Sequence, residues 1–123
     1  MSITTLLKRY YTNLKTPEAW SGLLAENFRF VGGDMTKPEP VVGRQAYVAI
    51  LNRLMPLIAD VRVEQMFADG SSAVVRARYG WTFPIAGLVP GSVAEFWTTA
   101  HGKLTELTIF FDTLNFDRLV RRS

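Results

Sequence analysis

The hydrophobic residues of this chain follow a helical period in its first half and a period of two in its second half. Apolar residues three or four positions apart predict an amphipathic helix over about residues 4–14, with Tyr10 on its buried stripe and Tyr11 off that stripe. A short helix is expected to start at Thr16-Pro17-Glu18, and a third helix to run from Gly43-Arg44 to about Pro56.

From Asp60 onward apolar and polar residues alternate, which is typical of half-buried strands. The predicted strands are Val61–Phe67, Ser72–Phe83, Ser92–Ala100 and Lys103–Phe111, joined by two Gly-containing turns and a loop over residues 84–91. An early strand over residues 27–31 is expected to join an edge of this sheet, and the last residues to form one or two helical turns. Helices followed by a meander of strands predict an α+β domain in which one strongly bent antiparallel sheet wraps around the helices.

The turn at His101-Gly102 sets the expected orientation of the last two strands. If the turn is tight, Ala100 pairs with Lys103 and side chains alternate between two faces from there. The nearly apolar face is expected to look inward and holds Ala94, Phe96, Thr98, Leu107, Ile109 and Phe111. The face expected to turn away holds Glu95, Trp97, Glu106, Thr108, Phe110 and Asp112.

Composition supports one folded domain over residues 1–123, because 48% of the residues are hydrophobic and 20% are charged. The chain has no cysteine, so a disulfide or a thiol nucleophile is excluded. The net charge of +3 is gathered partly in a C-terminal arginine cluster that is more typical of a helix end than of nucleic-acid binding. The absence of cysteine makes a cytoplasmic location the default expectation, and neither a signal peptide nor a membrane span is expected.

Several ionisable side chains are candidates for chemistry. Asp112 is either a base whose pKa is raised by desolvation between Phe110 and Phe111, or the cap of the final helix. Tyr10 is either a core tyrosine with a satisfied hydroxyl or a hydrogen-bond donor to a substrate. The single histidine, His101, lies at a hairpin tip without a second ligand, so neither a metal site nor a cofactor is expected.

The segments LLAENFRF, VVGRQAYVAIL, ADG and HGKLTELTIFFD, in this order, resemble the nuclear transport factor 2-like superfamily, particularly its SnoaL-like (polyketide-cyclase-like) branch. The resemblance covers nearly the whole chain. It implies a cone-shaped α+β half-barrel with a cavity between the sheet and the N-terminal helices, and pairing through the sheet into a homodimer. The superfamily includes ketosteroid isomerase, limonene-1,2-epoxide hydrolase and polyketide cyclases, so the fold alone does not define a reaction.

The resemblance to ketosteroid isomerase puts the tyrosine that binds the oxyanion at Tyr10, at the end of the first helix. It puts the catalytic base at Gly32 and the protonated aspartic acid at Ala94, neither of which can transfer a proton. Asp34 follows the base position by two residues.

The resemblance to the epoxide hydrolase puts an Arg-x-Asp pair at Arg76 and Arg78 and the last-strand acid at Ile109, so only the arginine is retained. In the cyclase branch, a late-strand acid corresponds to Asp112. The alternation places Arg76 and Arg78 on the less apolar face of their strand, which favours an outer face or a subunit contact.

Two hypotheses follow. In the first, the domain binds a small apolar or aromatic molecule in an inward cavity and carries out cofactor-free cyclisation, isomerisation or hydrolysis, with Asp112 as proton carrier and Tyr10 as donor. The residues expected to line that cavity are Trp20, Phe28, Phe30, Phe96, Ile109 and Phe111. In the second, the domain is a non-catalytic ligand-binding or homodimerising module, which the missing template acids favour slightly.

Overall fold

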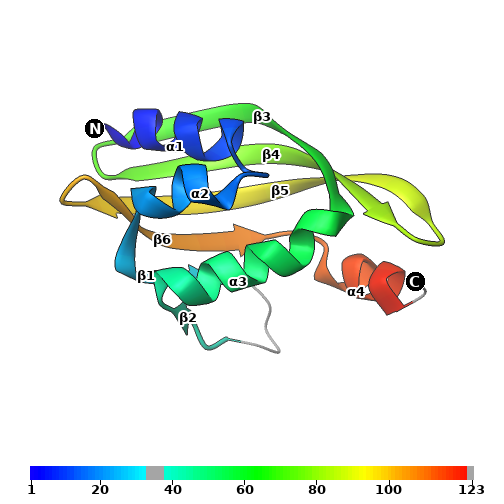
Figure 1. The fold of residues 1–123 in the computed structure, drawn as a ribbon. Coiled ribbons are helices and arrows are strands. Elements are labelled where there is room, and N and C mark those ends of the chain that lie inside the picture. Colours follow the sequence, from blue (N-terminus) through cyan, green and yellow to red (C-terminus); the bar gives the residue numbers. More distant parts are fainter. Residues whose placement is uncertain (33–37, 122–123) are drawn as a thin grey trace.

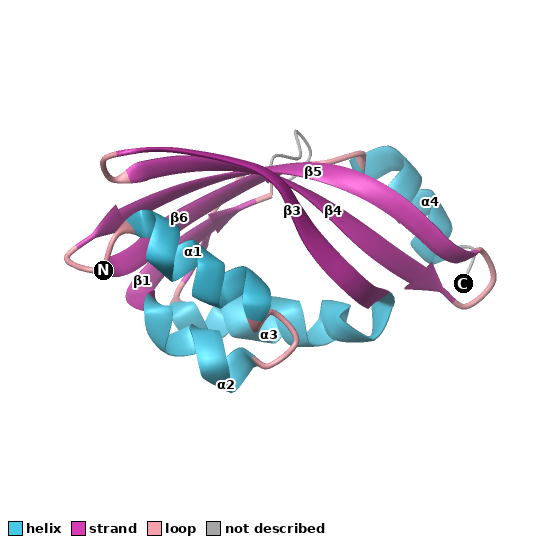
Figure 2. Cartoon of the chain, turned by 90° about the horizontal axis from the view of Figure 1, so that it is seen from above, coloured by secondary structure: helices cyan, strands magenta, loops and turns pink. Residues whose placement is uncertain are grey.

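In the computed structural model, which describes residues 1–32 and 38–121, one bent sheet curves around three helices (Figures 1 and 2). The helices are α1 (Ile3–Thr12), α2 (Pro17–Trp20), α3 (Arg44–Leu54) and α4 (Thr113–Arg121), with 3-10 turns at Ser21–Leu23 and Met55–Leu57. The strands are β1 (Leu24–Val31), β2 (Val41–Val42), β3 (Ile58–Asp69), β4 (Ser72–Phe83), β5 (Gly87–Ala100) and β6 (Lys103–Phe110). Figure 2 shows α1, α2 and α3 on the concave side of the sheet, and α4 beside the ends of β4 and β5.

The helices begin where the sequence supplies the groups that a helix start needs. The hydroxyl of Ser2 accepts a hydrogen bond from the amide of Thr5 (3.2 Å) and so caps α1. Pro17 occupies the first turn of α2, where its missing amide hydrogen costs nothing. Gly43 precedes α3 with φ of 116°, a conformation that favours glycine, and its amide donates to the carbonyl of Phe28 (2.7 Å).

The sheet order is β2-β1-β6-β5-β4-β3. The strands β3 to β6 form the predicted antiparallel meander. The expectation of a wholly antiparallel sheet is wrong, because β1 lies parallel to β6. The connection from β1 to β6 runs through α3 and the whole meander, so it is long enough for a parallel pair. The early strand therefore joins the sheet as expected and completes its curve around the helices.

Strand β5 starts earlier than predicted. The loop expected over residues 84–91 is wrong beyond residue 86, because Gly87–Gly91 pairs with Tyr79–Phe83 of β4. Pro90 suggested a loop because it lacks an amide hydrogen for a sheet ladder. The β5–β6 pairing ends where Ala94 meets Phe110, so Pro90 is paired with β4 only. On the β6 side of Pro90 no strand lacks a hydrogen bond because of the missing amide hydrogen.

A bulge in β6 changes which side of β5 looks inward. Ala100 pairs with Lys103 as predicted, but Thr98 pairs with Glu106, so Thr105 is an extra residue without a partner in the ladder. Side chains alternate between the two faces of a strand. This one-residue shift in pairing therefore turns each β5 residue from Thr98 back to Ala94 to the face opposite to the predicted one.

Leu107 is buried, and Ile109 and Phe111 pack against the core, so the inward orientation predicted for these three residues is confirmed. The inward orientation predicted for Ala94, Phe96 and Thr98 is wrong, as is the outward one of Glu95 and Trp97. Phe96 is 44% exposed and lies against exposed Phe110 on the outer face (ring centroids 5.8 Å apart).

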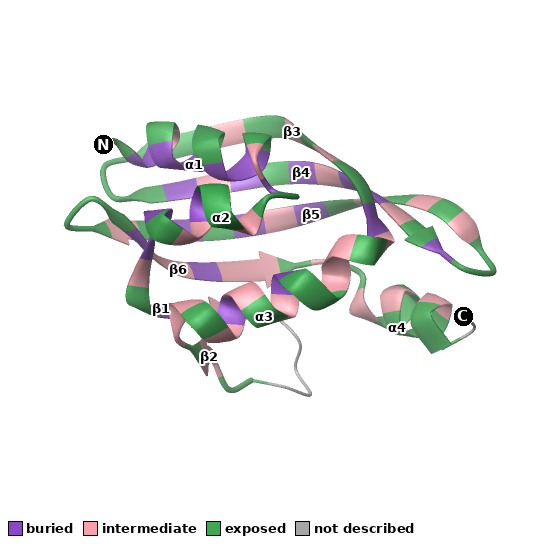
Figure 3. Ribbon diagram, in the orientation of Figure 1, coloured by how far each residue is buried: buried purple, intermediate pink, exposed green. Residues whose placement is uncertain are grey.

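The core lies between the concave face of the sheet and the helices, as the purple segments of Figure 3 show. Its largest fully buried side chains are aromatic: Trp20, Trp97, Tyr10, Tyr47, Phe28 and Phe83. Tyr10 lies at the centre, with edge contacts to Trp20 (5.2 Å) and Trp97 (4.8 Å). The indole N–H of Trp20 donates to the carbonyl of Leu14 (2.9 Å), which links the end of α2 to the residues that follow α1.

Candidate functional site

A buried carboxyl group lies in the middle of the concave face. Glu95 on β5 is 1% exposed and is the one buried charged residue in the part of the chain that the structure describes. The hydroxyl of Tyr11 donates to its Oε1 atom (2.9 Å), and the hydroxyl of Tyr79 lies 3.2 Å from the same oxygen. The imino group of Trp97 donates to the Tyr11 hydroxyl (3.0 Å). We call these four residues, Glu95, Tyr11, Tyr79 and Trp97, the acid–tyrosine cluster.

Burial controls the protonation of this cluster. Desolvation raises the pKa of Glu95 from its ordinary 4.5 to about 7, although the hydrogen bonds from Tyr11 and Tyr79 act in the opposite direction. The pKa values of both tyrosines are raised well above 10, first by burial and then by the nearby Glu95. The tyrosines therefore stay neutral donors, while Glu95 exchanges a proton near neutral pH.

Tyr10 and Tyr47 form a second hydroxyl pair in the same core, with their oxygens 2.5 Å apart. Burial raises the pKa of both side chains, so both hydroxyls keep their hydrogens. One O–H···O bond uses only one of the two hydrogens, which leaves one donor for another acceptor. The core interpretation of Tyr10 is confirmed by its 1% exposure, and its role as a donor to a substrate stays a prediction.

An apolar cavity of about 290 Å³ lies beside these tyrosines, between α3, the ends of β1 and β6, and α4. Its walls are Phe30, Gly32, Glu39, Val41, Ile50, Leu54, Trp81, Ile109, Phe111, Thr113 and Phe116. Phe30, Ile109 and Phe111 were among the residues predicted to line a cavity, and they do so. Trp20 and Phe28 are fully buried in the core and do not line this cavity, and Phe96 lies outside on the convex face.

The walls of this apolar cavity touch the tyrosines on two sides. Trp81 stacks on Tyr79, with ring centroids 5.1 Å apart and an interplanar angle of 13°. Phe30 packs against Tyr47 at 5.2 Å. Glu95 and Tyr79 do not line the cavity, so the rings of Tyr79 and Trp81, stacked on each other, lie between the carboxyl group and this space.

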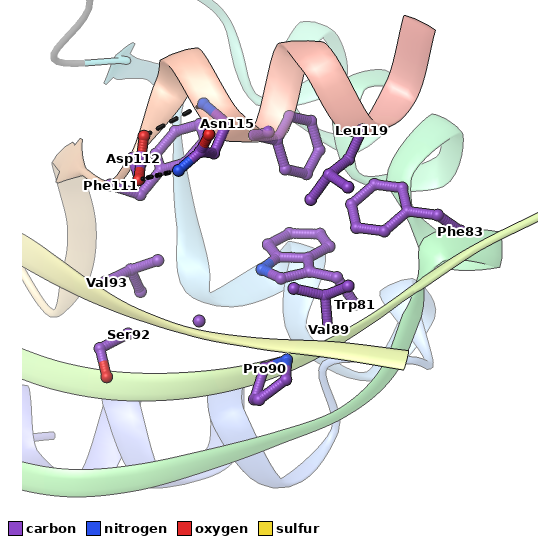
Figure 4. Close-up of a pocket in the computed structure, with 12 residues that line it drawn as sticks. Trp81, Phe83, Val89, Pro90, Ser92, Val93, Phe111, Asp112, Asn115 and Leu119 are labelled. Atoms are coloured by element: carbon purple, nitrogen blue, oxygen red, sulfur yellow. Dashed lines mark hydrogen bonds between the residues drawn. The ribbon is translucent and has the colours of Figure 1, made fainter. Parts of the chain in front are cut away.

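Asp112 caps the N-terminus of α4. Its Oδ1 atom accepts from the amide of Asn115 (3.1 Å), and its Oδ2 atom accepts from the Asn115 side chain (2.8 Å; Figure 4). The capping interpretation is confirmed. Asp112 is exposed and not buried between Phe110 and Phe111. Asp34, the other candidate acid, lies outside the described residues.

The acid–tyrosine cluster was missed because Glu95, Trp97 and Tyr11 were expected on the wrong faces of their elements. Tyr11 falls off the apolar stripe of α1, yet it is buried because its hydroxyl reaches Glu95 across the core. The protonated acid implied at Ala94 by the resemblance to ketosteroid isomerase is one residue away from Glu95, which the bulge turns inward. Arg76 is exposed and pairs with Glu64 (3.9 Å), which agrees with the predicted outer face of its strand.

Residues 1–32 and 38–121 contain no group of three or more side chains suited to holding a metal ion. Within the same residues, none of the helices has both the length and the apolar character to cross a lipid bilayer.

The chain belongs to the SnoaL-like domain family, whose sequence profile matches residues 7–107. No curated protein sequence matches the chain. Among solved structures, it is similar to a candidate SnoaL-like polyketide cyclase from Jannaschia sp. CCS1, with 20% identity, a TM-score of 0.78, and 95% of this chain and 90% of that chain covered.

It is also similar to an NTF2-like protein of unknown function from Cytophaga hutchinsonii ATCC 33406, with 19% identity, a TM-score of 0.75, and 93% of each chain covered. TerC, which was co-crystallised with polyporic acid, shares 18% identity with a TM-score of 0.78 over 96% of this chain and 97% of its own. These likenesses show that the chain has the α+β cone-like fold of SnoaL-like and NTF2-like proteins.

Stability should fall as pH rises through the titration of Glu95. Between pH of about 4.5 and 7 the folded state holds a proton that the unfolded chain has lost, so the free energy of unfolding decreases across this interval. The loss should be on the order of 3 kcal/mol, at about 1.4 kcal/mol per pKa unit. Urea unfolding of wild type and of Glu95→Gln measures it, because the variant should lack this decrease.

The exposed Glu18 provides a matched control, since Glu18→Gln should keep the pH profile of the wild type. Parallel profiles for Glu95→Gln and wild type would show that Glu95 ionises normally in the folded protein.

Proposed function

We propose that this SnoaL-like domain binds a small, flat, mostly apolar molecule in the apolar cavity. The observation that carries the proposal is the lining, in which large apolar side chains from five elements, α3, α4, β1, β4 and β6, surround one space. A cavity of this composition favours a ligand with a hydrophobic body, because burial of apolar surface drives binding. The exposed Glu39 at the wall is the one ionisable lining residue in the described part of the chain.

The size of the cavity limits the ligand. At about 290 Å³ it lies near the lower end of the range of ligand sites, roughly 300 to 1,000 Å³, which suits a molecule of about two fused rings. The crystal structure of TerC with polyporic acid supports the general idea, because a protein of the same fold was crystallised together with a small organic molecule.

Cofactor-free acid/base chemistry is the second candidate function, and Glu95 is the observation that favours it. Its raised pKa of about 7 allows it to accept and return a proton near neutral pH, and Tyr11 and Tyr79 hold its position. In this candidate the carboxylate removes a proton from a carbon next to a carbonyl group, and a tyrosine hydroxyl donates to the resulting enolate oxygen. The reaction requires the rings of Trp81 and Tyr79 to move aside, because they separate Glu95 from the cavity.

The outer face of the sheet supports a homodimer. Phe96 and Phe110 are 44% and 48% exposed and contact each other at the middle of this face. Phe67, which is also exposed, continues the apolar surface through Val74 toward the β3 edge. A second copy of the chain would present the same aromatic rings around a two-fold axis, as an isologous interface requires.

A larger side chain in the cavity should weaken ligand binding. Val41 lines the apolar cavity, and its neighbour Val42 points away from it and is exposed, so the two positions form a matched pair. Val41→Trp should raise the Kd for the fluorescent probe 2-naphthol at least about 10-fold, because the indole ring fills the space. Val42→Trp should stay within about twofold of wild type. Fluorescence titration measures both values, and equal affinities for the two variants would place the ligand elsewhere.

Proton transfer is measured with 2-tetralone, a flat ketone with exchangeable hydrogens. In deuterated water, the wild-type domain should accelerate exchange at the carbons next to the carbonyl, and Glu95→Gln should lose most of that acceleration, by about 100-fold or more. Glu18→Gln should behave like wild type. If the ketone binds and wild type does not accelerate exchange, the domain binds without catalysis.

A charge on the outer face should separate the dimer. Phe96→Lys places an ammonium group at the centre of the proposed interface, so it should raise the dimer dissociation constant at least about 10-fold. Ile85→Lys at the β4–β5 turn, which is 75% exposed, is the control and should leave the mass unchanged. Light scattering after size exclusion reports the mass, and a monomeric wild type would exclude this interface.

A further inference from the structure

A second cavity of about 300 Å³ lies between α4 and the strands β4 and β5 (Figure 4). The two spaces share three aromatic walls, Trp81, Phe111 and Phe116. The further walls of the second cavity come from the first half of β5 and from α4, and they include Val89, Val93 and Leu119. The two cavities are therefore neighbouring spaces on either side of a few rings.

Phe116 is the shared wall that comes from α4. Its ring makes edge contacts with Trp81 (5.0 Å), Phe83 (5.8 Å) and Phe111 (5.5 Å), so three rings fix its position. Trp81 belongs to the sheet, and Phe111 follows β6 directly, so both are fixed by strand pairing. Phe116 is carried by a helix that has no buried residue, so it is the wall that can be removed or moved with the least change to the core.

The second cavity has a different set of polar groups from the first, whose polar wall residues are Glu39 and Thr113. Asp112, Asn115 and Ser92 lie on its wall, and the carboxylate of Asp112 can accept a further hydrogen bond in addition to those from Asn115. An apolar ring system that extends across both cavities would therefore place its far end beside hydrogen-bond acceptors.

We propose that Phe116 divides one longer binding site into two and so sets the upper size limit of the ligand, which makes it a specificity-determining residue. This inference rests on the proposed binding function. With the ring in place, the site accepts molecules of about two fused rings; without it, the joined space is roughly twice as large. The ligand class for the joined site is a flat, polycyclic molecule with a hydroxyl or amino group at the end that reaches Asp112.

The test compares two phenols of different size on three forms of the protein. The probes are 2-naphthol and 1-hydroxypyrene, and the forms are wild type, Phe116→Ala and Leu114→Ala, titrated by fluorescence. Wild type should bind 2-naphthol and bind 1-hydroxypyrene at least about 10-fold more weakly. Phe116→Ala should bind 1-hydroxypyrene at least about 10-fold more tightly than wild type does. Leu114→Ala, at a position on the same helix that is 60% exposed, should show the preference of wild type.

The outcomes separate this inference from the proposed function. If wild type binds neither probe, the proposed binding function is wrong. If wild type binds 2-naphthol and Phe116→Ala gains no affinity for 1-hydroxypyrene, the partition by Phe116 is wrong while the binding function remains. Circular dichroism shows whether α4 stays folded, and Phe116→Leu, which keeps an apolar anchor but removes the ring, provides the same comparison if the alanine variant loses the helix.

Discussion

The inward direction of β5 depends on one unpaired residue in the neighbouring strand. Thr105 adds a position to β6 without adding one to β5. The residues of β5 up to Thr98 therefore point to the face opposite to the one that pairing without a bulge would give. This shift places Glu95 and Trp97 among the tyrosines of the helices and places Phe96 on the convex surface. Both the buried acid and the exposed aromatic face of the sheet therefore result from one insertion in the ladder.

A buried carboxyl group is costly, and the structure shows how the cost is limited. Glu95 loses its water but receives hydrogen bonds from Tyr11 and Tyr79, and no buried side-chain nitrogen or oxygen among the described residues lacks a partner. Replacement by a well-packed apolar residue is often neutral or stabilising for such groups. The burial of Glu95 is therefore not in itself a sign that its carboxyl group stabilises the fold.

The sequence predicted the order of helices and strands because hydrophobic periodicity reports directly on which faces are buried. It also predicted the inward direction of Leu107 and Ile109. Both residues follow Thr105 in β6, and no further bulge interrupts the alternation of side chains between them. It could not locate Glu95, because no local residue pattern marks Thr105 as a bulge. Tyr11 was missed for a related reason, since its burial is due to a polar contact across the core, and apolar periodicity does not register such contacts.

The parallel pairing of β1 with β6 joins Leu24 to Leu104 and Val31 to Thr108, segments near opposite ends of the chain. Contacts between such distant segments carry a large loop-closure entropy and slow the search for the native topology. Phe30 on β1 and Ile109 next to the end of β6 stand on opposite sides of this seam, and both line the apolar cavity. This space is complete only after the two segments have paired, so a ligand that bound there would stabilise the contact between β1 and β6.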